Sequence, residues 1–155
     1  MKKLKLIKTF LLVILISSCG YTPIYKNLDN INFKINIVET NGDRDTNNQI
    51  RSNLYKYSFG NDERVFDVKI NSKYTKNILT KDTTGAATEY QIVIDVIFGI
   101  KSKNSDMTLK YSESFNLQNI TDKLEEKNYE KDLSSNSIKI ITQKLILKLS
   151  RTNDN

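Results

Sequence analysis

The chain has 155 residues, with 24 Lys or Arg, 18 Asp or Glu, no histidine and a single cysteine. Without histidine it lacks the commonest metal ligand and the usual general base near neutral pH, and with one cysteine it cannot form an intramolecular disulfide. Four of the basic residues lie among the first eight positions, so the rest of the chain has 20 basic against 18 acidic residues and no dense basic block typical of nucleic-acid binding.

The first 18 residues have the three-part pattern of a secretory signal peptide. A lysine-rich leader precedes the apolar run Phe10–Ile16, and Ser17 and Ser18 lead into Cys19. A helix of seven residues spans about 10 Å, against a hydrocarbon core of roughly 30 Å, so the run is not expected to remain as a transmembrane helix.

Ile16-Ser17-Ser18-Cys19 is typical of a bacterial lipoprotein processing site. We therefore expect cleavage between Ser18 and Cys19, with a diacylglycerol and an N-acyl chain attached to Cys19. The alternative is an ordinary leader followed by a cysteine that has no role. On the first interpretation residues 1–18 are removed, residues 19–30 form a lipidated tether, residues 31–151 form one domain and residues 152–155 are a polar tail.

The domain begins with a strand and a helix. Residues 31–37 alternate apolar and polar side chains, which predicts a half-buried strand. A turn follows over residues 40–45. Thr46 and Gln49 have the spacing of a capping box, and the apolar spacing after them predicts a helix over residues 47–59.

Three longer strands are predicted next, over residues 64–80, 88–101 and 107–117. The turns between them are residues 81–85 and 103–106. The strand over 88–101 carries apolar residues on both faces, so we expect it at the centre of the sheet.

The last predicted element is a long helix between Asp122 and Arg151. Its clearest apolar positions are Leu124, Leu133, Ile141, Leu145 and Leu149. Its first half is acidic and its second half basic, a pattern that complements the helix macrodipole and is interpreted as solvation rather than a binding site. The poor helix formers at residues 134–137 allow a break or a late start.

The order β-α-β-β-β-α predicts an α+β fold. We expect a two-layer sandwich with a four-stranded, mostly antiparallel sheet and two helices packed on one face.

Catalysis is not expected. No serine lies in a G-x-S-x-G turn, and no histidine can act as a base. Glu89 and Asp95 are separated by about 20 Å along their predicted strand, too far for a paired acid and base. The composition therefore favours a binding or assembly protein over an enzyme, with no cofactor beyond the acyl chains on Cys19.

Three stretches in order resemble the lipopolysaccharide-assembly lipoprotein family LptE, also called RlpB. Residues 19–25 (CGYTPIY) are similar to the family's C-G-[FY]-x-P-[LI]-Y start. Residues 85–91 (GAATEYQ) are similar to its G-x-x-x-E-Y-Q segment before a core strand. The stretch from Phe115 through residues 127–132 (KNYEKD) to Leu149 resembles its F-x-x-N turn and amphipathic final helix.

The resemblance implies a non-enzymatic plug inside an LptD-type outer-membrane β-barrel, where it supports barrel assembly and lipopolysaccharide transport to the outer leaflet. It also implies lipopolysaccharide contacts through basic residues. Lys127, near the start of the final helix, falls on a matching basic position; at the hairpin before E-Y-Q the matching position is Thr83, and the candidate Lys81 lies two residues earlier. The alternative for both lysines is a solvated surface charge. The chain would be lipid-anchored in the outer membrane on its periplasmic side, and Gly20 after the cysteine agrees with sorting there. The alternative is another outer-membrane lipoprotein, acting as an auxiliary subunit of an ABC-type lipid transporter or as an envelope scaffold.

Overall fold

The computed structural model describes residues 33–59 and 64–152. The predicted signal peptide, Cys19 and most of the tether and tail lie outside these residues. The described elements, in chain order, are strand β1 (Lys34–Gly42), helix α2 (Arg44–Leu54), the 3₁₀ helix η2 (Tyr55–Phe59), strands β2 (Val65–Lys81), β3 (Ala87–Lys101) and β4 (Asp106–Gln118), and helix α3 (Lys123–Arg151).

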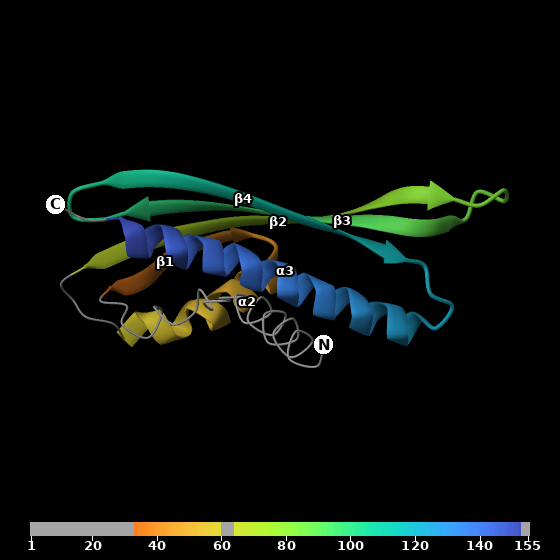
Figure 1. Ribbon diagram of the computed structural model, residues 1–155, viewed down its shortest axis with the longest axis horizontal. Helices are drawn as coiled ribbons and strands as arrows, with labels where there is room; N and C mark the ends of the chain where they lie inside the picture. Colours follow the sequence, from red (N-terminus) through yellow and green to blue (C-terminus); the bar gives the residue numbers. More distant parts are fainter. Residues whose placement is uncertain (1–32, 60–63, 153–155) are drawn as a thin grey trace, which may run out of the picture. The chain divides into compact units, whose positions relative to one another are not determined.

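The four strands form one sheet in the order β1-β2-β3-β4, with α2 and α3 on one face (Figure 1). β1 and β2 are parallel, whereas β2–β3 and β3–β4 are antiparallel. Parallel neighbours need a crossover connection, which α2 and η2 supply. The predicted α+β sandwich and the central position of the third strand are confirmed, and the sheet is mixed because of its first pair.

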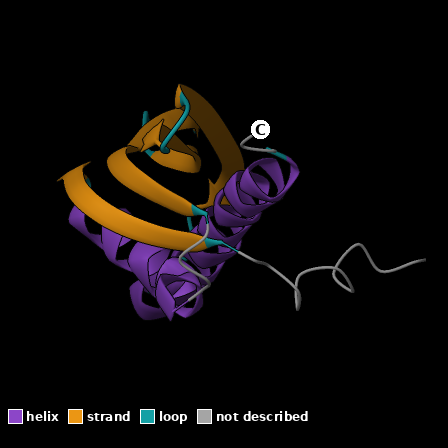
Figure 2. Ribbon diagram, turned by 90° about the vertical axis from the view of Figure 1, so that its left-hand side faces the viewer, coloured by secondary structure: helices purple, strands orange, loops and turns teal. Residues whose placement is uncertain are grey.

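Figure 2 views the domain from one end and shows the sheet curved over the two helices. The core lies between these layers. Phe33 packs edge-to-face against Phe66 with ring centroids 5.7 Å apart, and stacks on Tyr57 at 5.9 Å. The other fully buried large side chains come from every major element: Ile35, Ile50, Leu54, Ile70, Ile92, Ile94, Phe98, Leu117, Ile138 and Ile141.

The first strand is longer than predicted. It continues to Gly42, which pairs with Ser72, although a register shift occurs between Ile37 and Glu39. This bulge inserts Val38 and breaks the apolar–polar alternation, which is why the sequence pattern indicates an early end. Gly42 has φ +93°, and a Cβ there would lie 1.8 Å from the Ser72 carbonyl oxygen, so only glycine fits this position.

The predicted start of the first helix is wrong by one turn. Asp43 is the N-cap, and its carboxylate accepts a 2.8 Å hydrogen bond from the Thr46 N–H. Thr46 is instead buried inside α2. The helix thus begins three residues before Thr46, so Thr46 and Gln49 have the spacing of a capping box but do not lie at the start of the helix. The last predicted turns, from Tyr55, are 3₁₀ helix.

The final helix is continuous from Lys123 to Arg151, so neither the break nor the late start that residues 134–137 allow occurs. Ser134 and Ser137 are buried and lie on the same stripe as Ile141. Leu124, by contrast, is 68% exposed and its predicted place in the apolar face is wrong. Buried Glu126 follows it by two residues, about 200° around the helix, so Leu124 points away from the sheet.

Within the described ranges, none of the helices combines the length and the apolar character required to cross a membrane.

Candidate functional site: the arm and the start of the final helix

The far ends of β2 and β3 form an arm, defined as residues 75–91, whose tip extends beyond the helices (Figure 1) and whose base also pairs with β4 through residues 89–91. Every β2 residue from Lys76 to Lys81 is exposed. Ile78 and Leu79 are 53% and 44% exposed, and register shifts lie on both sides of Thr80. The arm therefore combines apolar and basic side chains with little burial.

The tip of the arm is held by Asp82. Its carboxylate accepts hydrogen bonds from the Thr84 N–H at 2.8 Å, the Thr84 hydroxyl at 2.6 Å and the Ala86 N–H at 3.0 Å. These bonds, that of the Thr84 hydroxyl above all, lower the pKa of Asp82 below its usual value. Gly85 has φ +88°, which completes the turn. The structure places Lys81 immediately before this turn, exposed.

The start of α3 lies at the same end of the domain as the arm (Figure 1). Asp122 caps the helix by accepting bonds from the N–H groups of Leu124 at 2.8 Å and Glu125 at 3.2 Å. Lys127 follows in the second turn and is exposed. Both predicted lipopolysaccharide-contact residues are thus accessible, but they lie on separate segments.

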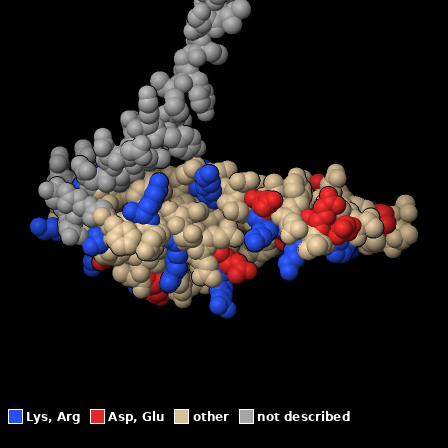
Figure 3. Space-filling view, turned by 90° about the horizontal axis from the view of Figure 1, so that it is seen from below, with Lys and Arg blue, Asp and Glu red and all other residues tan. Residues whose placement is uncertain are grey.

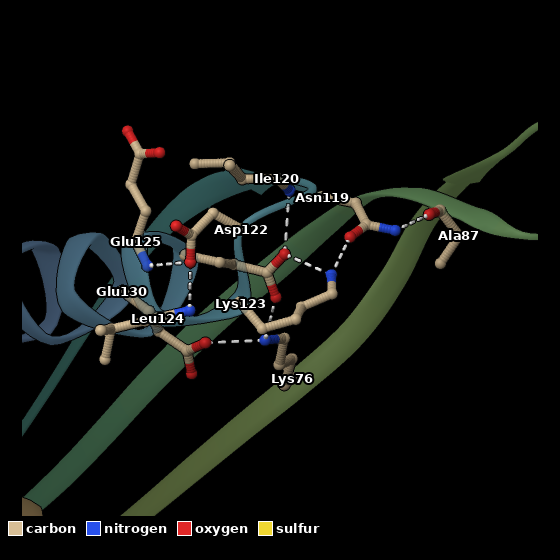
Figure 4. A network of polar contacts seen from close by, with 10 residues as sticks. Lys76, Ala87, Asn119, Ile120, Asp122, Lys123, Leu124, Glu125 and Glu130 are labelled. Carbon is tan, nitrogen blue, oxygen red and sulfur yellow. Dashed lines mark hydrogen bonds and ion pairs between the residues drawn. The ribbon is translucent and has the colours of Figure 1, made fainter.

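A polar network joins these two segments (Figure 4). Asn119 donates from its side chain to the Ala87 carbonyl at 2.6 Å and from its backbone to the Thr88 carbonyl at 2.9 Å. Lys123 donates to Asn119 and, at 2.9 Å, to Glu126. The loop before α3 is thereby bonded both to the base of the arm and to the helix that follows.

Glu126 is the centre of this network. The residue is 8% exposed, and its Oε2 accepts from the Lys123 ammonium and from the Ile120 N–H, at 2.9 Å in each case. The hydrogen bond from Lys123 is the main reason that the pKa of Glu126 is below its usual value, and it outweighs the opposing effect of burial.

Lys76, at the base of the arm, connects β2 to the same helix. Its ammonium lies 2.7 Å from Glu130 and 3.8 Å from Glu126, and it sits 4.5 Å from the centroid of the Tyr90 ring. Tyr74 also donates to Glu130. Burial, followed by this bond to a carboxylate, raises the pKa of Tyr74 above its usual range. Two residues of β2 therefore bind one carboxylate of α3.

The network divides the cations of this end into two kinds. Lys76 and Lys123 are neutralised by Glu126 and Glu130. Lys81 and Lys127 are exposed and form no ion pair with any residue of the described ranges. Figure 3 shows acidic side chains gathered towards this end with basic ones among them, so the visible face has no continuous basic surface. The free positive charge here is confined to isolated lysines.

Sequence reasoning did not identify the network. The acidic start of α3 does more than complement the helix dipole, because Glu126 and Glu130 bond to β2 and to the preceding loop. The spacing in the sequence could have indicated it. Glu126, Glu130 and Ser134 recur every four residues and therefore lie on the same helix face as the buried apolar residues that follow.

Among residues 33–59 and 64–152, no three acidic side chains are grouped so that they could hold a metal ion. What these residues can offer a ligand is the exposed lysines Lys81 and Lys127 and the exposed apolar side chains of the arm.

The sequence has no match among protein-family models and none among curated protein sequences. The fold does match solved structures. Rare lipoprotein B from Shewanella oneidensis superposes with a TM-score of 0.52 at 12% identity, over 71% of this chain and 91% of that one. A lipoprotein B from Nitrosomonas europaea gives 0.53 at 12% identity, over 77% and 86%. The domain thus has the fold of lipoprotein B, and the resemblance seen in the sequence is confirmed for the fold.

Proposed function

We propose that this chain is an outer-membrane lipoprotein of LptE (RlpB) type. It plugs and supports assembly of an LptD-type barrel and assists lipopolysaccharide transport to the outer leaflet. Two independent lines support this: the sequence motifs, and a fold shared with lipoprotein B over most of both chains. Neither line depends on the other, because the structural relatives are only 12% identical to this chain.

In this proposal the attachment to the membrane is covalent and lies at Cys19, after cleavage behind Ser18. A single acyl chain holds a protein only marginally, whereas two or more anchor it stably. A diacylglycerol and an N-acyl chain on one cysteine meet that requirement. The remainder of the chain, with its small net charge, then needs no electrostatic attraction to lipid.

The observation that carries the lipopolysaccharide part of the proposal is the arm. Lipopolysaccharide is an anionic amphiphile, so a protein that holds it without chemistry needs cations beside apolar surface. Ile78 and Leu79 supply exposed apolar surface two or three residues from Lys81. Lys127 supplies a second cation at the same end of the domain, and neither lysine is neutralised by a described neighbour.

Binding of lipopolysaccharide to the detergent-solubilised full chain tests this site. The double variant Lys81→Glu/Lys127→Glu is expected to bind roughly tenfold more weakly, since each reversal replaces a weak attraction by a repulsion. The matched control, Lys139→Glu/Lys148→Glu, makes the same charge change at exposed lysines in the second half of α3. Equal binding by both double variants and the parent would overturn the assignment of Lys81 and Lys127.

Isolation of the native complex from membranes tests the partner. The proposal expects an LptD-type barrel to co-purify with the lipidated chain from the outer membrane. Co-purification of an inner-membrane ABC-type transporter instead would favour the alternative role as an auxiliary subunit of a lipid transporter.

A further inference from the structure

Gly99 lies within β3, a strand that has a neighbour on each side. Glycine weakens a strand interior, and it often marks a bulge or a place where a ligand or another backbone comes close. The pairing of β3 passes through Gly99 without a register shift, opposite Lys69 of β2 and Thr108 of β4. Its φ is not positive either. Neither a bulge nor a special backbone conformation therefore accounts for this glycine.

The space beside Gly99 is open in the described part of the chain. Apart from its chain neighbours, a Cβ built there would meet only the Lys69 Cβ within 4 Å, at 3.7 Å, which is ordinary van der Waals contact. No described backbone approaches the glycine, so a larger residue would fit. The position thus has the open space expected where a ligand approaches a strand.

This space belongs to a hollow on the face of the sheet that is turned away from the helices. Side chains alternate between the two faces of a strand. Phe98 and Ile100 are buried on the side of α2 and α3, so Gly99 and Lys101 belong to the opposite face, which no described helix covers (Figure 2). The hollow has a volume of about 500 Å³ and lies at the other end of β3 from the arm. Small-molecule sites have volumes in this range.

The charged groups that line the hollow alternate in sign. Lys101 of β3 lies opposite Asp67 of β2 on one side and opposite Asp106 of β4 on the other. The Asn36 side chain donates a 3.1 Å hydrogen bond to Oδ1 of Asp67, which holds this carboxylate in place. Within residues 33–59 and 64–152, neither Lys101 nor Asp106 forms an ion pair. Both therefore have hydrogen-bonding capacity to offer a ligand.

This lining favours a neutral ligand rich in hydroxyl groups. Lys69 is already paired with Glu39 at 2.8 Å, which leaves two carboxylates and one ammonium and so disfavours an anion such as a phosphate. Those groups and the Thr108 hydroxyl supply both donors and acceptors, and each hydroxyl of a sugar both donates and accepts. Val38, which is 54% exposed, and the bare Cα of Gly99 offer apolar surface to the C–H groups of a sugar ring.

We propose that this hollow binds a neutral sugar ring, seated over Gly99 with its hydroxyls bonded to Lys101 and the two aspartates. The site is separate from the arm and requires no barrel partner, so it goes beyond the proposed function. A sugar ring of this kind belongs either to the saccharide part of a glycolipid or to a free glycan, and the two sources are separated below.

An NMR titration of the full chain, in a detergent without a sugar headgroup, tests the site. The probes are methyl α-glucoside, methyl α-galactoside and N-acetylglucosamine, with O-phosphoethanolamine as a zwitterion that has no ring. We expect at least one sugar to shift the amide signals of Gly99, Lys101 and Thr108 at millimolar concentrations, and the zwitterion to leave them unchanged. No shift with any of the sugars overturns the proposal, as does a response to the zwitterion as large as that to the sugars.

Filling the hollow provides a second test. Valine suits a strand and has room at position 99, so Gly99→Val should unfold at the same temperature as the parent or higher, yet bind the sugar roughly tenfold more weakly or worse. Asp106→Asn should weaken binding several-fold, because it replaces a charge-assisted hydrogen bond by a neutral one. Ser112→Val, at an exposed position on the same face of β4, is the control and should bind like the parent. Equal binding by Gly99→Val and the parent would exclude this hollow.

Lipopolysaccharide binding by Gly99→Val separates the two sources of the sugar. A loss that parallels the loss of free-sugar binding identifies the saccharide part of the glycolipid, whereas unchanged lipopolysaccharide binding identifies a separate glycan. The double variant Lys81→Glu/Lys127→Glu should bind the free sugars like the parent. Failure of the arm site and failure of the hollow are thus distinguishable.

Discussion

The same two strands behave differently at their two ends. In the body of the domain, β2 and β3 supply Phe66, Val68, Ile94 and Phe98, all fully buried under α2 and α3. In the arm β2 is exposed from Lys76 onward and β3 is mostly half-buried. Lys76 bonds there to Glu130 of α3, and Asn119, in the loop before α3, bonds to Ala87. The β2–β3 pair is therefore stabilised by apolar burial at one end and by a few polar contacts at the other.

The largest effect is expected in the body. Phe66→Ala removes a side chain with no exposed surface that packs against Phe33, and should lower the free energy of unfolding by about 3–5 kcal/mol. The matched change in the arm, Ile78→Ala, should cost about 0.5 kcal/mol or less because the side chain is already exposed. Urea unfolding of the two variants measures the contrast. Equal losses would mean that the arm is part of the cooperative core.

An intermediate effect is expected where body and arm meet. Tyr74→Phe keeps the ring but removes the hydroxyl that donates to Glu130. The loss should be about 1.5–3 kcal/mol, typical of one hydrogen bond to a charged group. The same unfolding assay measures it, with Tyr129→Phe, on the exposed side of α3, as the control. A value as large as that of Phe66→Ala would contradict a purely local bond.

A smaller, local effect is expected in the arm itself. Lys76→Met removes the ion pairs to Glu126 and Glu130 while keeping an unbranched apolar chain of nearly the same length. Amide hydrogen exchange should become several-fold faster in the arm, at Thr88 and Tyr90, with the core unchanged. Lys73→Met, at an exposed position three residues earlier in β2, is the control. Unchanged exchange at Thr88 would show that the backbone ladder alone holds the arm.

The smallest effect is expected from pH, on the loop before α3 that is bonded to the base of the arm. The pKa of Glu126 is lowered in the folded protein, first by its bond from Lys123, so its contribution is complete above the unfolded value and is lost as the pH falls through the folded value. The Ile120 N–H donates its hydrogen bond to Glu126. Protection of this amide against hydrogen exchange should thus decrease at pH values below 4.5, before protection in the core is affected.

The control for the pH effect is Glu126→Gln. Glutamine can still accept from the Ile120 N–H but does not titrate, so its exchange profile should be flatter over the same pH range. A parent profile as flat as that of the variant would exclude Glu126 as the titrating group.

Much of the fold could be predicted because local patterns and tertiary packing agree. The strand over residues 88–101 is apolar on both faces, and the structure places it second from the edge, between β2 and β4. Ile141, Leu145 and Leu149 repeat every four residues and are all buried. The patterns failed where a contact distant in sequence decided the outcome. The bulge at Val38 arises from pairing with β2, and the exposure of Leu124 follows from the inward turn of Glu126.

The sequence by itself determined the order of strands and helices, the lack of histidine and the positions of Lys81 and Lys127, whereas lipoprotein processing at Cys19 stays a prediction. These depend on composition and on periods of two and 3.6 residues, which short stretches of chain reveal. Only the tertiary structure decided which lysines are neutralised and which residues surround Gly99. Lys76 is separated from Glu130 by 54 positions, and no local period carries that information.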